Sequence, residues 1–273
     1  MLKRILVAVV FLPLLFYVLF YAPPVCLPIL VSVLSAIAIH EILWSTGCVK
    51  HFRISVYSTI LGALIPLWFY FGGRPIQMFI AIFVYVVLLF CEAIGSKRQV
   101  TLEKMGSAFF VSIMIPMFLS SFVRIMHMEA GRYYLLLPFV SAFTSDAFAL
   151  FAGMLFGKHK LAPSLSPKKT VEGSIGGFIG SIVCVLIYAV IVGNIWGFEP
   201  NYLIFVLYGL LGSAISQLGD LSFSYIKRQY GIKDYGNLLP GHGGILDRFD
   251  SVIFCAPLTE IMLLLVPFFT KAV

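Results

Sequence analysis

The stretch Gly173-Ser-Ile-Gly-Gly-Phe-Ile-Gly-Ser-Ile-Val-Cys-Val-Leu-Ile-Tyr-Ala-Val-Ile-Val-Gly-Asn-Ile-Trp196 contains no charged residue. An apolar run of about 20 residues is long enough to cross the hydrocarbon core of a bilayer as an α-helix. Similar runs recur along the 273-residue chain, which is 60% hydrophobic and 11% charged. A soluble domain has about 25% charged residues. The sequence therefore predicts an all-α integral membrane protein.

The apolar runs predict about nine transmembrane helices. The first five form a predicted N-terminal membrane region, residues 1–132, and the last four form a predicted C-terminal catalytic membrane region, residues 133–273. Two long loops, residues 158–172 and 227–250, connect helices of the second region. The predicted helices lie at residues 5–22, 26–45, 54–71, 76–95, 106–124, 133–157, 173–196, 201–226 and 251–270.

The distribution of lysine and arginine predicts the orientation of these helices. If the N-terminus is cytoplasmic, the cytoplasmic segments hold 15 of the 19 lysines and arginines. Cytoplasmic loops of membrane proteins carry such an excess. We therefore expect both long loops in the cytoplasm and the C-terminus on the opposite side. The net charge of +7 does not indicate nucleic-acid binding, because the basic residues lie in short loops between apolar runs. The residues left on the other side are Arg74, Arg124, Arg132 and Lys271.

The second long loop and its flanks, residues 224–250, read SYIKRQYGIKDYGNLLPGHGGILDRFD and form the most polar long segment of the chain. Charged groups near a bilayer cost free energy, so a dense cluster of them indicates function. Carboxylates, cations and glycines in one segment suit a metal-assisted reaction of phosphates. Glycines also let backbone N–H groups converge on an anion. The candidate residues are Lys227, Arg228, Lys233, Asp234, His242, Gly243, Gly244, Asp247, Arg248 and Asp250.

A polar stripe precedes this segment on the predicted helix 201–226. Its members are separated by three or four residues and therefore share one helix face. Serines in such a stripe are also explained by hydrogen bonds back to their own helix, whereas a carboxylate there has no such partner and indicates function. The stripe consists of Ser213, Ser216, Asp220, Ser224 and Lys227.

Four carboxylates are candidate ligands of Mg²⁺, which prefers oxygen donors. Asp247 and Asp250 are three residues apart and share a face of the last helix, although capping by the helix dipole is an alternative explanation for Asp250. Asp220 lies one helix earlier, and Asp146 is a second intramembrane carboxylate. The sequence assigns no role to the remaining carboxylates in apolar surroundings, Glu41, Glu92 and Glu260.

The first long loop supplies two candidate phosphate ligands, Lys168 and Lys169 in the run Ser-Pro-Lys-Lys-Thr. An ordinary positively charged cytoplasmic loop is the alternative explanation. Glycines spaced by four, such as Gly173 and Gly177, are interpreted as helix-packing positions rather than chemistry.

At these residues the chain resembles the phosphatidate cytidylyltransferase (CDP-diacylglycerol synthase) family. The family pattern of Ser, Lys-Arg, Lys-Asp, His-Gly-Gly, Asp-Arg and Asp is complete between Ser224 and Asp250. The Ser-Pro-x-Lys-Thr segment is also similar, with Val171 where the family has a tryptophan. The resemblance covers residues 140–250 well, and the first five helices match only as hydrophobic spans.

The resemblance implies an enzyme that makes CDP-diacylglycerol and pyrophosphate from CTP and phosphatidic acid. It also implies dependence on Mg²⁺, as one ion or two, a homodimer, and an active site facing the cytoplasm in the plasma membrane of a bacterium. We predict the metal ligands Asp146, Asp220, Asp247 and Asp250. The predicted catalytic residues are Lys227, Arg228, Lys233, Asp234, His242 and Arg248. The predicted substrate-binding residues are Lys168, Lys169, Ser224, Gly243 and Gly244.

Two alternatives use the same residues differently. A related CTP-dependent enzyme, a CDP-archaeol synthase or a lipid-alcohol kinase, would employ the same loops. An ion transporter would use Glu92, Asp146 and Asp220 as a permeation path, but the charges gather on one predicted side of the membrane instead of spanning both.

Overall fold

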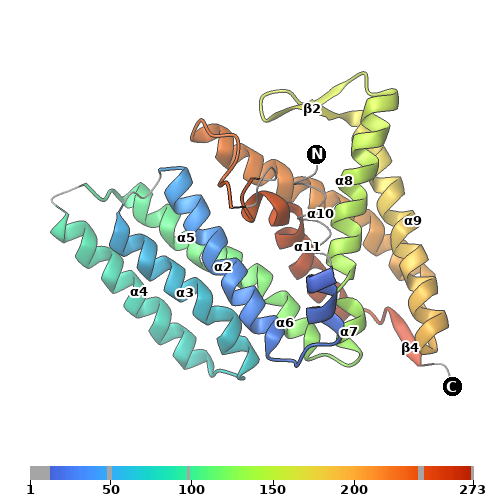
Figure 1. Ribbon diagram of the computed structural model, residues 1–273, viewed down its shortest axis with the longest axis horizontal. Coiled ribbons are helices and arrows are strands. Elements are labelled where there is room, and N and C mark those ends of the chain that lie inside the picture. The colour runs from blue at the N-terminus through green and yellow to red at the C-terminus, as the bar shows by residue number, and fades with distance from the viewer. Residues whose placement is uncertain (1–12, 48–50, 97–98, 239–242, 272–273) are drawn as a thin grey trace. The chain divides into compact units, whose positions relative to one another are not determined.

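The computed structural model describes residues 13–47, 51–96, 99–238 and 243–271 (Figure 1). The long helices follow the apolar runs. They are α2 (Cys26–Ser45), α3 (Phe52–Tyr70), α4 (Pro75–Gly95), α5 (Leu102–Leu119), α8 (Leu137–Phe156), α9 (Val171–Trp196), α10 (Tyr202–Gln229) and α11 (Leu246–Leu265). The short elements are α6 (Ser121–Met126), α7 (Gly131–Tyr134), β1 (Lys160–Ala162), β2 (Ser166–Thr170), β3 (Phe198–Pro200) and β4 (Phe269–Lys271).

The predicted all-α membrane architecture is confirmed. Within the described residues, seven helical segments are long and apolar enough to cross a membrane. Residues 5–12 of the predicted helix 5–22 lie outside the described residues, and residues 13–20 are helical. The last predicted helix, 251–270, is α11, which begins five residues earlier and includes Asp247 and Asp250. The total of nine spans and the sidedness of the termini stay predictions.

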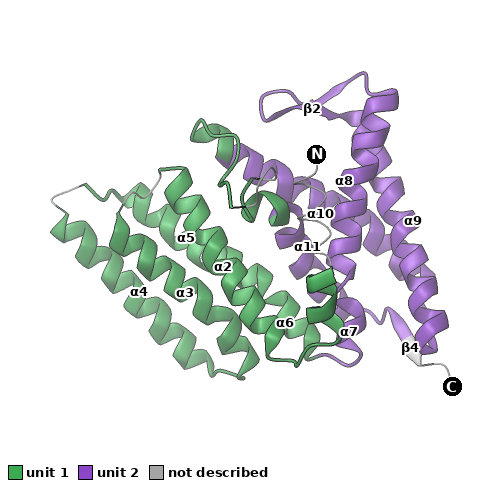
Figure 2. Cartoon of the chain, in the orientation of Figure 1, with its two compact units in different colours: residues 1–127, 227–249 green, residues 128–226, 250–273 purple. Residues whose placement is uncertain are grey.

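The chain forms two compact units (Figure 2). Unit 1 contains residues 1–127 and 227–249, and unit 2 contains residues 128–226 and 250–273. Helices α10 and α11 each pass from one unit into the other. Residues 227–249, which we call the polar loop, therefore belong to the same unit as the N-terminal helices, although residues 128–226 of unit 2 lie between them in the sequence. The functional division into regions 1–132 and 133–273 stays a prediction.

Helix α3 is central to unit 1, where it packs against α2, α4 and α5 (Figure 1). Gly62 permits this packing, because a Cβ atom there would overlap Cδ1 of Ile39. Helix α4 buries only Tyr85 and Leu89 and exposes an otherwise apolar surface, as expected of a helix in contact with lipid. The Tyr85 hydroxyl is hydrogen-bonded to the Ser58 hydroxyl at 2.7 Å, so this buried polar group is satisfied inside the unit.

In unit 2, helices α8 and α9 run side by side (Figure 1). A Cβ atom on Gly176 would overlap Cβ of Ala152, and one on Gly173 would lie 2.7 Å from the Ala149 carbonyl oxygen. Small residues therefore allow the two backbones to approach closely, as the glycine spacing predicts.

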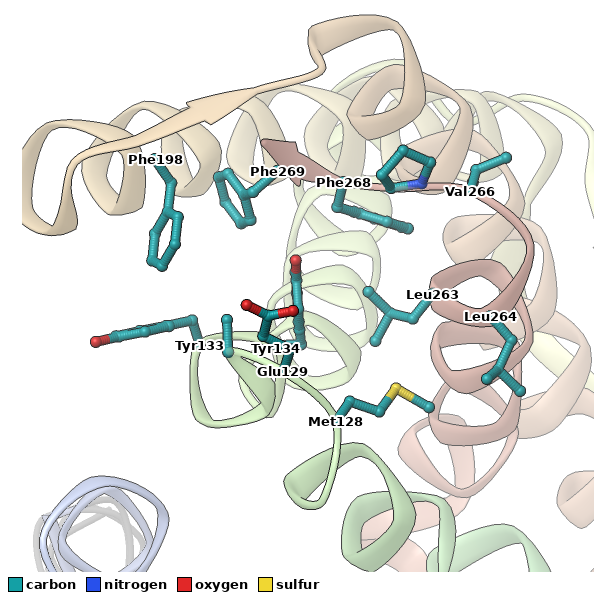
Figure 3. A pocket seen from close by; sticks show the side chains of 12 residues that line it. Met128, Glu129, Tyr133, Tyr134, Phe198, Leu263, Leu264, Val266, Phe268 and Phe269 are labelled. Carbon is teal, nitrogen blue, oxygen red and sulfur yellow. The ribbon is translucent and has the colours of Figure 1, made fainter. Parts of the chain in front are cut away.

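Unit 2 also contains an aromatic cavity of about 900 Å³ beyond the C-terminal end of α9 (Figure 3). Its lining includes Tyr133, Tyr134, Phe198 and Phe269, and β3 pairs antiparallel with β4 beside it. The cavity lining includes none of the residues that the sequence assigns to a site. Two predicted site residues of unit 2, Lys168 and Lys169, lie instead on the hairpin β1–β2, which precedes the N-terminus of α9.

Candidate active site

In unit 2, the hairpin β1–β2 carries Lys169 to a carboxylate of α10. The Lys169 Nζ lies 2.5 Å from Oδ2 of Asp220, and the Ser224 hydroxyl donates a hydrogen bond to Oδ1 at 3.2 Å. The side chains of Lys169 and Asp220 are 25% and 24% exposed. Three predicted site residues from two distant segments are therefore brought together, and both charged groups remain accessible to a ligand.

Local hydrogen bonds fix the hairpin that presents Lys169. The Thr170 hydroxyl caps α9 by accepting from the Gly173 N–H at 3.1 Å. The Glu172 carboxylate accepts from the Lys158 N–H at 3.0 Å and contacts the His159 imidazole Nδ1 at 2.6 Å. The loop 158–172 is thus closed at its base, while Lys168 is exposed on β2.

The polar stripe of α10 contacts other helices rather than only its own backbone. The hydroxyls of Ser213 and Ser145 lie 2.8 Å apart, which joins α10 to α8. The Gln217 amide donates to Ser213 at 3.1 Å and accepts from the Ser174 hydroxyl at 2.5 Å, which joins α10 to α9. The Ser213 hydroxyl is therefore hydrogen-bonded to side chains, and the alternative explanation, a hydrogen bond back to the backbone of its own helix, does not apply to it.

Helix α11 places two more predicted ligands beside one serine in unit 2. The Ser251 hydroxyl donates to Oδ2 of Asp146 at 3.3 Å, and the Ser251 N–H donates to Oδ1 of Asp250 at 2.8 Å. A Cβ atom on Gly219 would lie 2.9 Å from the Asp250 carbonyl oxygen, so α10 passes directly against α11 beside Asp220. Asp250 is the fifth residue of α11, beyond the first turn, where the helix dipole stabilises a carboxylate most.

The four predicted ligands are all carboxylates, and oxygen donors suit Mg²⁺ better than zinc. Among the residues that the structure describes, however, no three His, Cys, Asp or Glu side chains are grouped so that they could hold a metal ion. Asp247 belongs to unit 1, whereas Asp146, Asp220 and Asp250 belong to unit 2. The magnesium site therefore stays a prediction from the sequence.

In unit 1, Asp247 is buried and binds three donors of the polar loop. Its Oδ1 accepts from the Lys227 ammonium at 2.9 Å, and its Oδ2 accepts from the backbone N–H groups of Tyr235 at 2.8 Å and Gly244 at 3.0 Å. The Asp247 side chain is only 2% exposed. Two predicted site residues, Lys227 and Asp247, thus meet as a buried ion pair that also ties the loop together.

The other charged residues of the polar loop lie nearer to solvent. Lys233, Asp234 and Arg248 are exposed, and the exposed Arg228 donates to the Ile232 carbonyl at 3.1 Å. Gly243 has a φ of +88°, a conformation that favours glycine. The predicted catalytic residue His242 lies outside the described residues.

Glu41 and Glu92, to which the sequence pattern assigns no role, both have partners in the structure. Glu41 of α2 accepts from the N–H groups of Ile245 at 3.0 Å and Leu246 at 2.8 Å, at the start of α11. Glu92 of α4 lies 3.5 Å from the guanidinium of Arg53. The only signal for Glu41 in the sequence is a carboxylate inside an apolar run, and its partners lie 204 and 205 residues further along the chain.

A model of the cytidylyltransferase family matches residues 2–266. The chain belongs to this cytidylyltransferase family. A phosphatidate cytidylyltransferase of Bacillus subtilis (strain 168) is 35% identical over 87% of this chain and 88% of its own length. One from Thermotoga maritima is 32% identical over 85% of this chain and 86% of its own. One from Staphylococcus haemolyticus is 45% identical over 49% of this chain and 50% of its own.

These similarities confirm the resemblance that the pattern between Ser224 and Asp250 predicts, and this cytidylyltransferase is a nucleotidyltransferase. The family match also extends through the first five helices, where the sequence pattern shows only hydrophobic spans. Unit 1 supplies Glu41 to the polar loop from this N-terminal part.

Proposed function

We propose that this cytidylyltransferase makes CDP-diacylglycerol and pyrophosphate from CTP and phosphatidic acid in phospholipid biosynthesis. The observation that best supports this proposal is the family match over residues 2–266, which includes the complete polar pattern of residues 224–250. The relatives from Bacillus subtilis and Thermotoga maritima, similar over 87% and 85% of the chain, both bear the name phosphatidate cytidylyltransferase.

The ion pair between Lys169 and Asp220 suggests how the anionic nucleotide enters. In the structure each of these charges neutralises the other at 2.5 Å. A triphosphate competes for Lys169 and releases Asp220 to bind a cation. Because the two side chains are 25% and 24% exposed, this exchange of partners requires side-chain rotation and no opening of a core.

We assign Mg²⁺ to Asp220, with Asp146 and Asp250 of the same unit as further ligands. Asp247 is a fourth ligand that only the sequence predicts. The ion would supply charge neutralisation between two anionic reactants. The exposed cations Lys168, Lys233 and Arg248 would bind phosphate oxygens and stabilise charge in the transition state.

The proposed reaction is an in-line displacement at phosphorus. A phosphate oxygen of phosphatidic acid forms a bond to the α-phosphorus of CTP, the bond from that phosphorus to the bridging β-phosphate oxygen breaks, and pyrophosphate leaves. The attacking oxygen is already an anion, so the reaction needs no strong general base. Ser224 therefore need not be a covalent nucleophile, and we assign its role to the hydrogen bond that it donates to Asp220.

We also propose a homodimer in the plasma membrane of a bacterium, with the active site facing the cytoplasm. The exposed apolar faces of α4 and α9 support placement in a bilayer. The excess of lysine and arginine in the segments that hold the site supports its cytoplasmic orientation, where CTP is available.

The test is an assay of the purified protein with phosphatidic acid in detergent micelles, Mg²⁺ and each of the four ribonucleoside triphosphates. We expect pyrophosphate release only with CTP, only when phosphatidic acid is present, and in equal amount to CDP-diacylglycerol. Release of CDP with a lipid alcohol as acceptor would identify a kinase instead. Ion flux into reconstituted vesicles without nucleotide would identify a transporter.

A further inference from the structure

The carboxylate of Glu41 contacts the polar loop although it belongs to helix α2. It is buried, with the residue 6% exposed, and its two oxygens each accept one backbone N–H, from Ile245 at 3.0 Å and from Leu246 at 2.8 Å. The first N–H groups of a helix have no partner within the helix. Glu41 therefore provides, from another part of unit 1, the acceptors that the start of α11 requires.

Two glycines of the loop pack directly on this carboxylate. A Cβ atom on Gly244 would lie 2.5 Å from Oε2 of Glu41, and one on Gly236 would lie 2.8 Å from Oε1. For both glycines, the three atoms nearest to such a Cβ all belong to Glu41. Larger residues at these positions would displace the carboxylate from the backbone N–H groups that it binds.

Glu41 and Asp247 together hold the base of the loop. Asp247 joins the N–H groups of Tyr235 and Gly244, while Glu41 contacts Gly236 and binds the two N–H groups that follow Gly244. Both ends of the loop are thus fastened by buried carboxylates. Asp247 belongs to the loop itself, whereas Glu41 connects the loop to the helical part of unit 1.

We propose that Glu41 is a positioning residue for cytidylyl transfer. By fixing the first turn of α11 and the base of the loop, it sets the orientation of Asp247 and Arg248. It does not touch substrate, because both of its oxygens are buried against backbone N–H groups. The inference rests on the proposed function, since it assumes that the loop takes part in cytidylyl transfer.

The first experiment compares Glu41→Gln with a matched control, Glu92→Gln. The amide introduced at position 41 offers one acceptor oxygen and turns a donor toward the second backbone N–H. We expect kcat to fall about 10²-fold, as for a misplacement of about 1 Å, with the KM for phosphatidic acid unchanged. The control removes a carboxylate that contacts Arg53 rather than the loop, so its kcat should stay at the wild-type value.

A double-substitution cycle tests the contact itself. Gly236→Ala should lower kcat because its Cβ collides with Glu41. Gly106→Ala should have no effect, because its added Cβ meets nothing within 4 Å beyond its own stretch of helix. In a Glu41→Ala background the collision is gone, so adding Gly236→Ala should change kcat little. Additive losses in the cycle would overturn the proposal.

Hydrogen exchange of the peptide that contains Ile245 and Leu246 separates positioning from general destabilisation. In Glu41→Gln these amides should exchange faster, while α3 and α5 keep wild-type protection and the protein stays monodisperse. Faster exchange with wild-type kcat would refute the positioning role and leave the proposed function intact.

If Glu41→Gln does not fold, Gly236→Ala carries the same test. If wild-type protein transfers no cytidylyl group, the proposed function fails and the positioning role with it, whatever the exchange shows.

Discussion

Asp220 and Asp247 look alike in the sequence but have different surroundings in the two units. Asp220 is 24% exposed and is bound by two side chains, Lys169 and Ser224. Asp247 is 2% exposed and is bound by two backbone N–H groups as well as by Lys227. Side chains can rotate away from a carboxylate, whereas backbone donors cannot leave without moving the loop. Asp220 is therefore suited to exchanging partners with a ligand, and Asp247 to holding the loop in place.

The largest effect is expected from Asp247→Asn, which should lose both activity and stability. Breaking a buried ion pair leaves an uncompensated charge, here Lys227, at a cost of about 3–5 kcal/mol. We expect a clear drop in the thermal unfolding midpoint in detergent. The double variant Lys227→Met/Asp247→Asn should recover stability but not activity, because the uncompensated charge is removed. An unchanged unfolding midpoint in the single variant would show that Asp247 does not hold the loop.

Asp220→Asn should lose activity without losing stability. Pyrophosphate release should fall about 10³-fold, as when a group that stabilises transition-state charge is removed. The unfolding midpoint should stay near wild type, because the accessible Lys169 regains water. Turnover within about tenfold of wild type would remove Asp220 from the metal site, since the loss of a transition-state contact costs more. A large drop in the unfolding midpoint would show that Asp220, like Asp247, is needed for the stability of the fold.

Lys169→Ala should weaken CTP binding more than Lys168→Ala does. The Lys169 ammonium is held beside Asp220 at 2.5 Å, whereas Lys168 is exposed on β2. A hydrogen bond to a charged group contributes about 1.5–3 kcal/mol, so the KM for CTP should rise about 10- to 100-fold for Lys169→Ala. Equal effects of the two substitutions would mean that the hairpin acts only as general positive charge.

Ser224→Ala should have the smallest effect. It removes one hydrogen bond to Asp220, which contributes about 1 kcal/mol, so kcat should fall about fivefold. Stability should change little because α10 keeps its other contacts. Complete loss of pyrophosphate release in a folded Ser224→Ala protein would contradict the assignment of Ser224 as a positioning group and would favour a covalent role.

The helices were predictable because hydropathy and length are local properties of the chain. The predicted helix 26–45 agrees with α2 at both ends, since both of its ends are marked by polar or proline-containing segments. The apolar run by itself places the start of the last helix at 251, five residues after Leu246, where α11 begins. A helix that begins among charged residues needs acceptors for its N–H groups, and Glu41 supplies them from α2.

The sequence by itself determined a polytopic membrane protein, the polar segment between Ser224 and Asp250, and its resemblance to cytidylyltransferases. Only the tertiary structure decided that Lys169 pairs with Asp220, that Asp247 ties its own loop, and that Glu41 caps α11. The physical reason is the range of the information. The length of an apolar run and the spacing of residues depend only on neighbouring residues in the sequence. The partner of a buried charge depends on how helices distant in sequence pack together.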